Sequence, residues 1–168
     1  MTANPAIAGI PLVLGGNVFG FTADECQQIA DACSHLSDDG LVVGTAGAVD
    51  AATVGVHDVT AAIQHDVSDV DGIAGQHVSL PPIVTIAGRE GATIATGDHF
   101  VDDAATVATI RELGGSLVDM ETYAYIWVAQ QFDVPIRVLK AVSDNAQDDA
   151  ISDWRAAVAA CRDRKGTR

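Results

Sequence analysis

A chain of 168 residues has the length of one compact domain that can bury a sizeable core. Its formal net charge of −14 at pH 7 argues against duplex nucleic acid and anionic membrane surfaces as partners, and leaves a small neutral ligand as the better fit. Hydrophobic residues make up 48% of the chain and no low-complexity tract occurs, so we expect residues 1–168 to fold as a single domain.

The cysteines and the amino terminus indicate the cellular compartment. Residues 1–10 lack the basic start and apolar run of a signal peptide, and no stretch approaches the roughly 18 apolar residues of a membrane span. The three cysteines form no CxxC pair and fall among apolar positions with helical spacing, so we expect reduced core thiols. These are Cys26, Cys33 and Cys161. We therefore expect a cytoplasmic protein.

The first quarter of the chain predicts a strand, a helix and a second strand. Residues 10–14 form a short apolar run closed by two glycines, which is typical of a buried strand. Thr22 and Glu25 have the spacing of a capping box, and a helix is predicted over about 23–36. Residues 41–43 then predict a strand that ends in a glycine turn at 44–47.

The rest of the chain continues to alternate between β-branched runs, turn-forming stretches and helical stripes. The elements expected first are one or two strands within 54–67, a loop over 68–82, and strands at 83–87 and 92–96. A helix follows that Asp102 or Asp103 caps and that ends at Gly114, and then a strand at 117–118, a helix to about 132 and a strand at 135–142. The last element is a helix with Ile151, Trp154, Val158 and Cys161 on one face.

This alternation predicts an α/β fold of three layers, with helices flanking a mixed, mostly parallel central sheet. In such sheets ligands bind beyond the carboxyl ends of the strands. Three predicted strand ends carry unusual polar sequences, namely 44–45, 119–121 and 143–144. We expect the functional site at these ends.

The acidic pair Asp119 and Glu121 has two interpretations. An Asp at the start of a helix is an ordinary cap, which the helix dipole stabilises by about 0.3–1 kcal/mol. A carboxylate here could equally accept hydrogen bonds from the vicinal hydroxyls of a ribose, with Met120 offering an apolar surface to the sugar. Local sequence leaves both interpretations open.

Two further segments also remain ambiguous. Ser143, Asp144 and Asn145 form a common turn and cap sequence, but a partly buried Asp at a strand end could instead donate a proton to a leaving group. The segment 97–100 could be a loop with Phe100 in the core, or it could expose Phe100 to stack on a purine.

No cofactor or metal ion is expected. The glycines at 44–47 match neither the spacing of a P-loop nor that of a dinucleotide-binding turn. The His-Asp pairs at 57–58 and 65–66 lack a third ligand at a recognisable spacing.

Taken together and in order, these turns resemble the purine nucleoside phosphorylase and nucleosidase superfamily, most closely the 5'-methylthioadenosine/S-adenosylhomocysteine nucleosidases and the small nucleosidases of actinobacteria. The resemblance covers roughly residues 39–162, and five motifs in the right order make it specific. The matching segments are 44–48 (GTAGA), 63–66 (IQHD), 95–101 (ATGDHFV), 117–121 (LVDME) with Ala124, and 134–146 (VPIRVLKAVSDNA).

The resemblance implies a nucleoside phosphorylase-like fold whose amino-terminal part, residues 1–22, is divergent or shortened. It also implies hydrolysis of the N-glycosidic bond of a purine nucleoside. Asp144 would be the general acid that protonates the purine at N7, which makes the base a better leaving group. The substrate-binding residues that it implies are Thr45, Phe100, Val101, Asp119, Met120, Glu121 and Ser143.

Two departures from the family pattern bear on the reaction. Family phosphorylases hold phosphate with arginines, and Val42 stands where one of them is expected, so water is favoured over phosphate as the nucleophile. Family nucleosidases also carry a water-activating glutamate near the amino terminus, whereas no acidic residue here precedes Asp24. A nucleoside-binding paralogue without turnover is therefore the main alternative. By analogy with relatives we expect a homodimer or a larger homo-oligomer.

Overall fold

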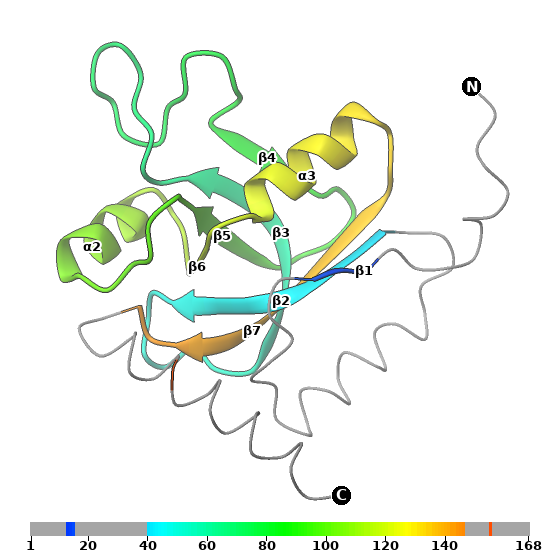
Figure 1. Ribbon diagram of the computed structural model, residues 1–168, viewed down its shortest axis with the longest axis horizontal. Helices are drawn as coiled ribbons and strands as arrows, with labels where there is room; N and C mark the ends of the chain where they lie inside the picture. The colour runs from blue at the N-terminus through cyan, green and yellow to red at the C-terminus, as the bar shows by residue number, and fades with distance from the viewer. Residues whose placement is uncertain (1–12, 16–39, 147–154, 156–168) are drawn as a thin grey trace, which may run out of the picture.

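The computed structural model describes residues 13–15, 40–146 and 155, drawn in colour in Figure 1. Several sequence predictions lie outside these residues: the helix at 23–36, the last helix with its apolar face, the three cysteines and the shortening of the amino terminus.

The described residues confirm the predicted alternation only in part: strands and helices alternate from residue 92 to 144, whereas the strands between residues 40 and 96 follow one another without a helix. The strands are β1 (Val13–Gly15), β2 (Gly40–Ala48), β3 (Val56–Gln64), β4 (Ile83–Thr85), β5 (Ala92–Thr96), β6 (Leu117–Asp119) and β7 (Ile136–Asp144). The helices are α2 (Ala104–Glu112) and α3 (Thr122–Gln131). No helix in the described part of the chain is long and apolar enough to cross a membrane.

The strands form one mixed sheet in which five of them close into a ring. β2 pairs in parallel with β1 and β7 and antiparallel with β6, while β5 pairs in parallel with β6 and β3. β3 pairs antiparallel with β4 and with β7, and the β3–β7 pairing completes the ring β2–β6–β5–β3–β7. Closure leaves fewer unpaired strand edges and brings the ends of strands from distant parts of the chain together.

The two described helices cover opposite faces of the β3–β5–β6 part of the sheet. Successive residues of a strand point to opposite faces. Ile94 of β5 belongs to one buried cluster with Tyr123 and Ile126 of α3. Its neighbour Ala95 belongs to another cluster with Val107 and Ile110 of α2. The hydrophobic pattern of β5 thus places a helix on each side of the sheet (Figure 1).

The predicted glycine turn at 44–47 is wrong, because β2 continues through it to Ala48. β7 pairs with β2 along this stretch, from Gly40 opposite Ile136 to Gly47 opposite Asp144. The glycines serve close packing instead of a turn. A Cβ added at Gly44 would lie 3.0 Å from Nζ of Lys140.

The same pairing extends β7 beyond its predicted end at Val142, so that Ser143 and Asp144 are the last residues of the strand. The α2 prediction is confirmed in detail. Asp103, one of the two expected caps, accepts hydrogen bonds from the backbone N–H groups of Ala105 and Thr106 at 3.0 and 2.9 Å.

A partly exposed ion pair joins β3 to β7 where the ring closes. Arg137 donates to both carboxylate oxygens of Asp58, at 2.8 Å each. This hydrogen bonding lowers the pKa of Asp58 below its ordinary value of 3.8. Asp58 is therefore engaged in a cross-strand contact.

Candidate functional site

Strand pairing brings the three polar strand ends to one region of the sheet. Gly47 of β2 lies opposite Asp144 of β7 and also opposite Val118 of β6. Thr96, the last residue of β5, lies opposite Asp119 of β6. The turn that begins at Gly97 is held here as well, because its N–H donates to the carbonyl of Asp119 at 3.1 Å. The ends of β2, β5, β6 and β7 therefore lie in one region of the sheet.

Asp144 is a buried carboxyl group with two local partners. Its side chain accepts hydrogen bonds from the N–H of Ala146 at Oδ1, at 2.9 Å, and from the hydroxyl of Ser143 at Oδ2, at 2.8 Å. Only 7% of the residue is exposed. A Cβ at Gly47 would lie 2.9 Å from Oδ1, so glycine at this position leaves the space that Asp144 occupies. The result is a fixed carboxyl group at a strand end.

Asp119 points into the protein, where it forms a buried ion pair that sequence reasoning missed. Nζ of Lys140 lies 2.8 Å from Oδ2 of Asp119, and the two side chains are only 2% and 3% exposed. Asp119 also accepts from the hydroxyl of Thr96 at 2.8 Å and from the N–H and hydroxyl of Thr122. Its carboxylate is thus occupied by protein groups, and it caps α3.

Because Asp119 caps the helix, the side chain of Glu121 is not required as a cap. Glu121 stands at the N-cap position of α3, yet its carboxylate makes no capping hydrogen bond and is exposed. Met120 beside it is 45% exposed. Thr45 of β2 is half-buried and lies opposite Ala141 of β7. A carboxylate next to an exposed thioether offers both polar and apolar contact to a sugar.

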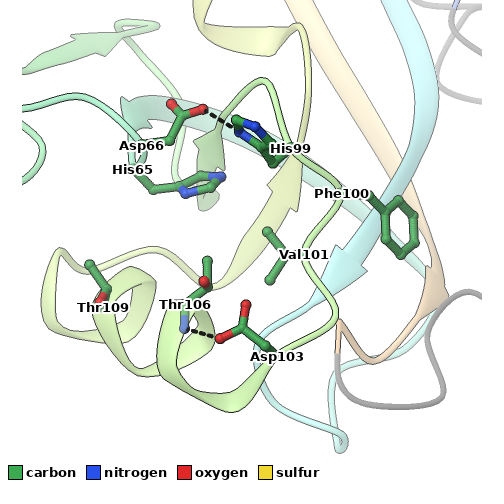
Figure 2. A pocket seen from close by; sticks show the side chains of 8 residues that line it. All are labelled: His65, Asp66, His99, Phe100, Val101, Asp103, Thr106 and Thr109. Carbon is green, nitrogen blue, oxygen red and sulfur yellow. Dashed lines mark hydrogen bonds and ion pairs between the residues drawn. The ribbon is translucent and has the colours of Figure 1, made fainter.

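The segment after β5 places one aromatic ring at the surface. Phe100 is 41% exposed, so the interpretation that assigned it to the core is wrong. Its neighbour Val101 is 5% exposed and packs in the cluster of Val107 and Ile110. Figure 2 shows the Phe100 ring pointing away from the other labelled side chains and toward β2 and β7.

A cavity of about 240 Å³ lies beside this segment (Figure 2). It is lined by His65, Asp66, His99, Phe100, Val101, Asp103, Thr106 and Thr109. His65 is buried, and its Nε2 has no hydrogen-bond partner in the part of the chain that the structure describes. In the sequence, His65 and Asp66 belong to a segment shared with the family and lack a third metal ligand at a recognisable spacing. Among the described residues no group of three metal-ligating side chains occurs.

Burial of His65 predicts a pH-dependent stability. Loss of water around the ring lowers its pKa from the ordinary 6.5, although Asp66 opposes this shift. The unfolded chain therefore binds the proton more strongly than the folded one. The stabilising contribution is complete above pH 6.5 and decreases as the pH falls toward the lower folded pKa.

Urea unfolding between pH 5 and about 7.5 measures this dependence. We expect the free energy of unfolding to fall with decreasing pH more steeply in the wild type than in His65→Asn. Equal slopes for the two proteins would show that His65 does not titrate with folding.

The sequence matches the family model described as the phosphorylase superfamily over residues 12–168. It is 34% identical over 103 residues to a 5'-methylthioadenosine/S-adenosylhomocysteine nucleosidase of Bacillus pumilus, covering 54% of this chain and 45% of that protein. It is 41% identical over 76 residues to an aminodeoxyfutalosine nucleosidase of Helicobacter pylori, covering 45% of this chain and 29% of that protein. The chain thus spans less than half the length of these curated relatives.

Solved structures show the same architecture. A Neisseria meningitidis 5'-methylthioadenosine/S-adenosylhomocysteine nucleosidase in complex with methylthio-immucillin-A superposes with a TM-score of 0.62 at 25% identity, covering 82% of this chain and 68% of that one. A futalosine hydrolase of Helicobacter pylori superposes with a TM-score of 0.63 at 22% identity, covering 84% of this chain and 72% of that one.

Proposed function

The chain belongs to the phosphorylase superfamily, and from this premise we propose that it hydrolyses the N-glycosidic bond of a purine nucleoside, giving the free base and a ribose derivative. Its fold is the nucleoside phosphorylase-like fold with a mixed sheet. The relatives that carry nucleosidase names support a nucleoside as substrate and hydrolysis as the reaction.

The observation that carries the proposal is the position of Asp144. A buried carboxyl group at the end of β7 lies at the same end of the sheet as the exposed Met120, Glu121 and Phe100. Asp144 can donate a proton, Glu121 can accept hydrogen bonds from sugar hydroxyls, and the Phe100 ring can stack on a base. This is the set that cleavage of a base from a sugar requires.

In the proposed reaction Asp144 donates its proton to N7 of the purine as the bond between C1' and N9 breaks. The bonding electron pair leaves with the base, so C1' and the ring oxygen share a positive charge. Glu121 accepts hydrogen bonds from the 2' and 3' hydroxyls, and its negative charge stabilises that cation. Water then adds to C1' and releases a proton.

The remaining site residues take supporting roles in this proposal. Phe100 stacks on the base, the backbone at Val101 contacts its edge, and Met120 packs under the sugar, with Thr45 near the sugar and the attacking water. Ser143 holds the carboxyl group of Asp144 by its 2.8 Å hydrogen bond. Asp119 acts indirectly. Its contacts with Lys140 and Thr122 fix the start of α3 and so position Met120 and Glu121.

Water is favoured over phosphate as the nucleophile. Val42 is 1% exposed and packs in the core cluster of β2, so it offers no positive charge to an anion. Lys140, the cation next to this stretch, is already paired with Asp119. A nucleoside-binding paralogue without turnover is the second candidate.

We also propose assembly into a homodimer or a larger homo-oligomer. Large apolar side chains are exposed on the described surface, which favours covering by another chain. The most exposed are Val70, Val54, Val78 and Phe132. Analytical ultracentrifugation of the purified protein measures the assembly.

Base release tests the function directly. Purified protein is incubated with methylthioadenosine, S-adenosylhomocysteine, adenosine, inosine and guanosine, with and without phosphate, and free base is quantified by chromatography. We expect release from at least one nucleoside without phosphate. Nucleoside binding without release would support the binding paralogue, and release that requires phosphate and yields ribose 1-phosphate would identify a phosphorylase.

A further inference from the structure

The turn that carries Phe100 is fastened to the end of β3 by two side chains that the proposed reaction does not use. We propose that Asp66 is a positioning residue for base binding, and that it acts with His65 to hold residues 97–100 in the conformation that presents the Phe100 ring. This inference rests on the proposed function, because it assigns a role within the same site.

The first contact is a hydrogen bond across the sequence. Oδ2 of Asp66 accepts from the backbone N–H of Asp98 at 2.6 Å, a short distance for an amide donor and typical of a charged acceptor. The same oxygen lies 3.7 Å from Nδ1 of His99, whose side chain is 87% exposed. The carboxylate of Asp66 therefore holds the backbone of Asp98, two residues before Phe100.

The second contact is steric. The backbone N–H of His65 donates to the carbonyl of Thr96 at 3.1 Å, and this hydrogen bond continues the β3–β5 pairing to the edge of the turn. The imidazole lies close to Gly97, where an added Cβ would be 2.3 Å from Nε2 of His65 and 2.9 Å from Cγ of Asp66. Because such a Cβ has no room, glycine at 97 lets the turn lie directly against His65 and Asp66.

Phe100 therefore stands between two anchors. Before it, Asp66 holds the backbone of Asp98; after it, Val101 is 5% exposed and packs in the α2 cluster. The ring between them is exposed and, in Figure 2, points away from His65 and Asp66. A ring fixed before the ligand arrives loses less conformational entropy on binding, so these anchors should increase the affinity for a stacked base.

The test separates binding from chemistry. In Asp66→Ala the acceptor for Asp98 is lost, and we expect KM of the nucleoside that the wild type hydrolyses to rise about tenfold, since a hydrogen bond to a charged group has about this effect. We expect kcat to change less than about twofold, because Asp144 and Glu121 stay in place. Asp66→Asn keeps a carbonyl oxygen that can accept from Asp98, so its KM should return to within about threefold of wild type.

Asp69→Ala is the matched control. Asp69 also accepts hydrogen bonds from backbone N–H groups, those of Asp71 and Ile73, but it holds the loop at 69–73 instead of the turn at 97–100. Its KM and kcat should equal those of the wild type. Asp66→Glu keeps the charge but moves it by one methylene, so it should raise KM and provides a second variant if Asp66→Ala does not fold.

Three results would overturn the inference: an unchanged KM in Asp66→Ala and Asp66→Glu, a fall in kcat with KM unchanged, or equal defects in Asp66→Ala and Asp66→Asn. Failure of the proposed function has a different signature. In that case the wild type itself neither binds nor cleaves a nucleoside, whatever residue stands at position 66.

Discussion

Asp144→Asn should release purine base about 10²- to 10⁴-fold more slowly than the wild type, the range expected for loss of a general acid. The amide has the same shape as the carboxyl group and can still accept at Oδ1 from the N–H of Ala146. It has no acidic proton to donate to N7. Nucleoside affinity should therefore stay within a few-fold of wild type, because Phe100, Met120 and Glu121 are untouched.

Single-turnover base release measures the chemical step, and isothermal titration calorimetry measures binding. Asp133→Asn is the control, because it makes the same substitution at an exposed residue after α3, at a positive φ that asparagine also accepts. A wild-type rate of base release in Asp144→Asn would remove Asp144 from the reaction. A loss of binding equal to the loss of rate would assign it to substrate affinity instead.

Lys140→Met should lower the free energy of unfolding by about 3–5 kcal/mol, the usual consequence of removing one partner of a buried ion pair. The variant leaves the carboxylate of Asp119 in the core, where both partner side chains are almost completely excluded from solvent. The thioether fills a similar volume, so loss of packing contributes little. Urea unfolding of the two proteins at pH 7 gives the difference.

The double variant Lys140→Met, Asp119→Asn tests whether the cost comes from the unpaired charge. The single oxygen of a neutral amide, placed as Oδ1, can still accept from the hydroxyl of Thr96 and the N–H of Thr122, so the double variant should be more stable than Lys140→Met alone. Arg111→Met is the control, since Arg111 is exposed and donates to one carbonyl, that of Val49. A loss below about 1 kcal/mol in Lys140→Met would show that Asp119 gains no stability from its buried partner.

The order of strands and helices could be predicted because each element repeats a local pattern. The apolar spacing of α2, its cap at Asp103 and the short β-branched strands all depend on neighbours in the sequence. The extent of β2 could not be predicted in this way. Its glycines signal a turn locally, whereas pairing with β7 keeps the backbone extended as far as Ala48. Closure of the ring likewise depends on contacts between distant strands.

In the candidate site as well, features with a local sequence signal could be predicted, and contacts between distant residues could not. The positions of Asp144, Glu121 and Phe100 at strand and turn ends followed from motifs, and the structure brings those ends together. The partner of Asp119 did not follow, because Lys140 lies on another strand. A lysine inside the apolar run 136–142 was the available signal, since a buried charge needs a partner. The contact of Asp66 with Asp98 spans 32 residues and has no local signal.

The most direct test of N-glycosidic hydrolysis is to run the reaction in water enriched in ¹⁸O and to analyse both products by mass spectrometry. The account predicts an unlabelled purine base and a ribose derivative that carries one solvent oxygen at C1', formed in the absence of phosphate. A sugar phosphate as the product, or no cleavage of any nucleoside by a protein that binds one, would contradict it.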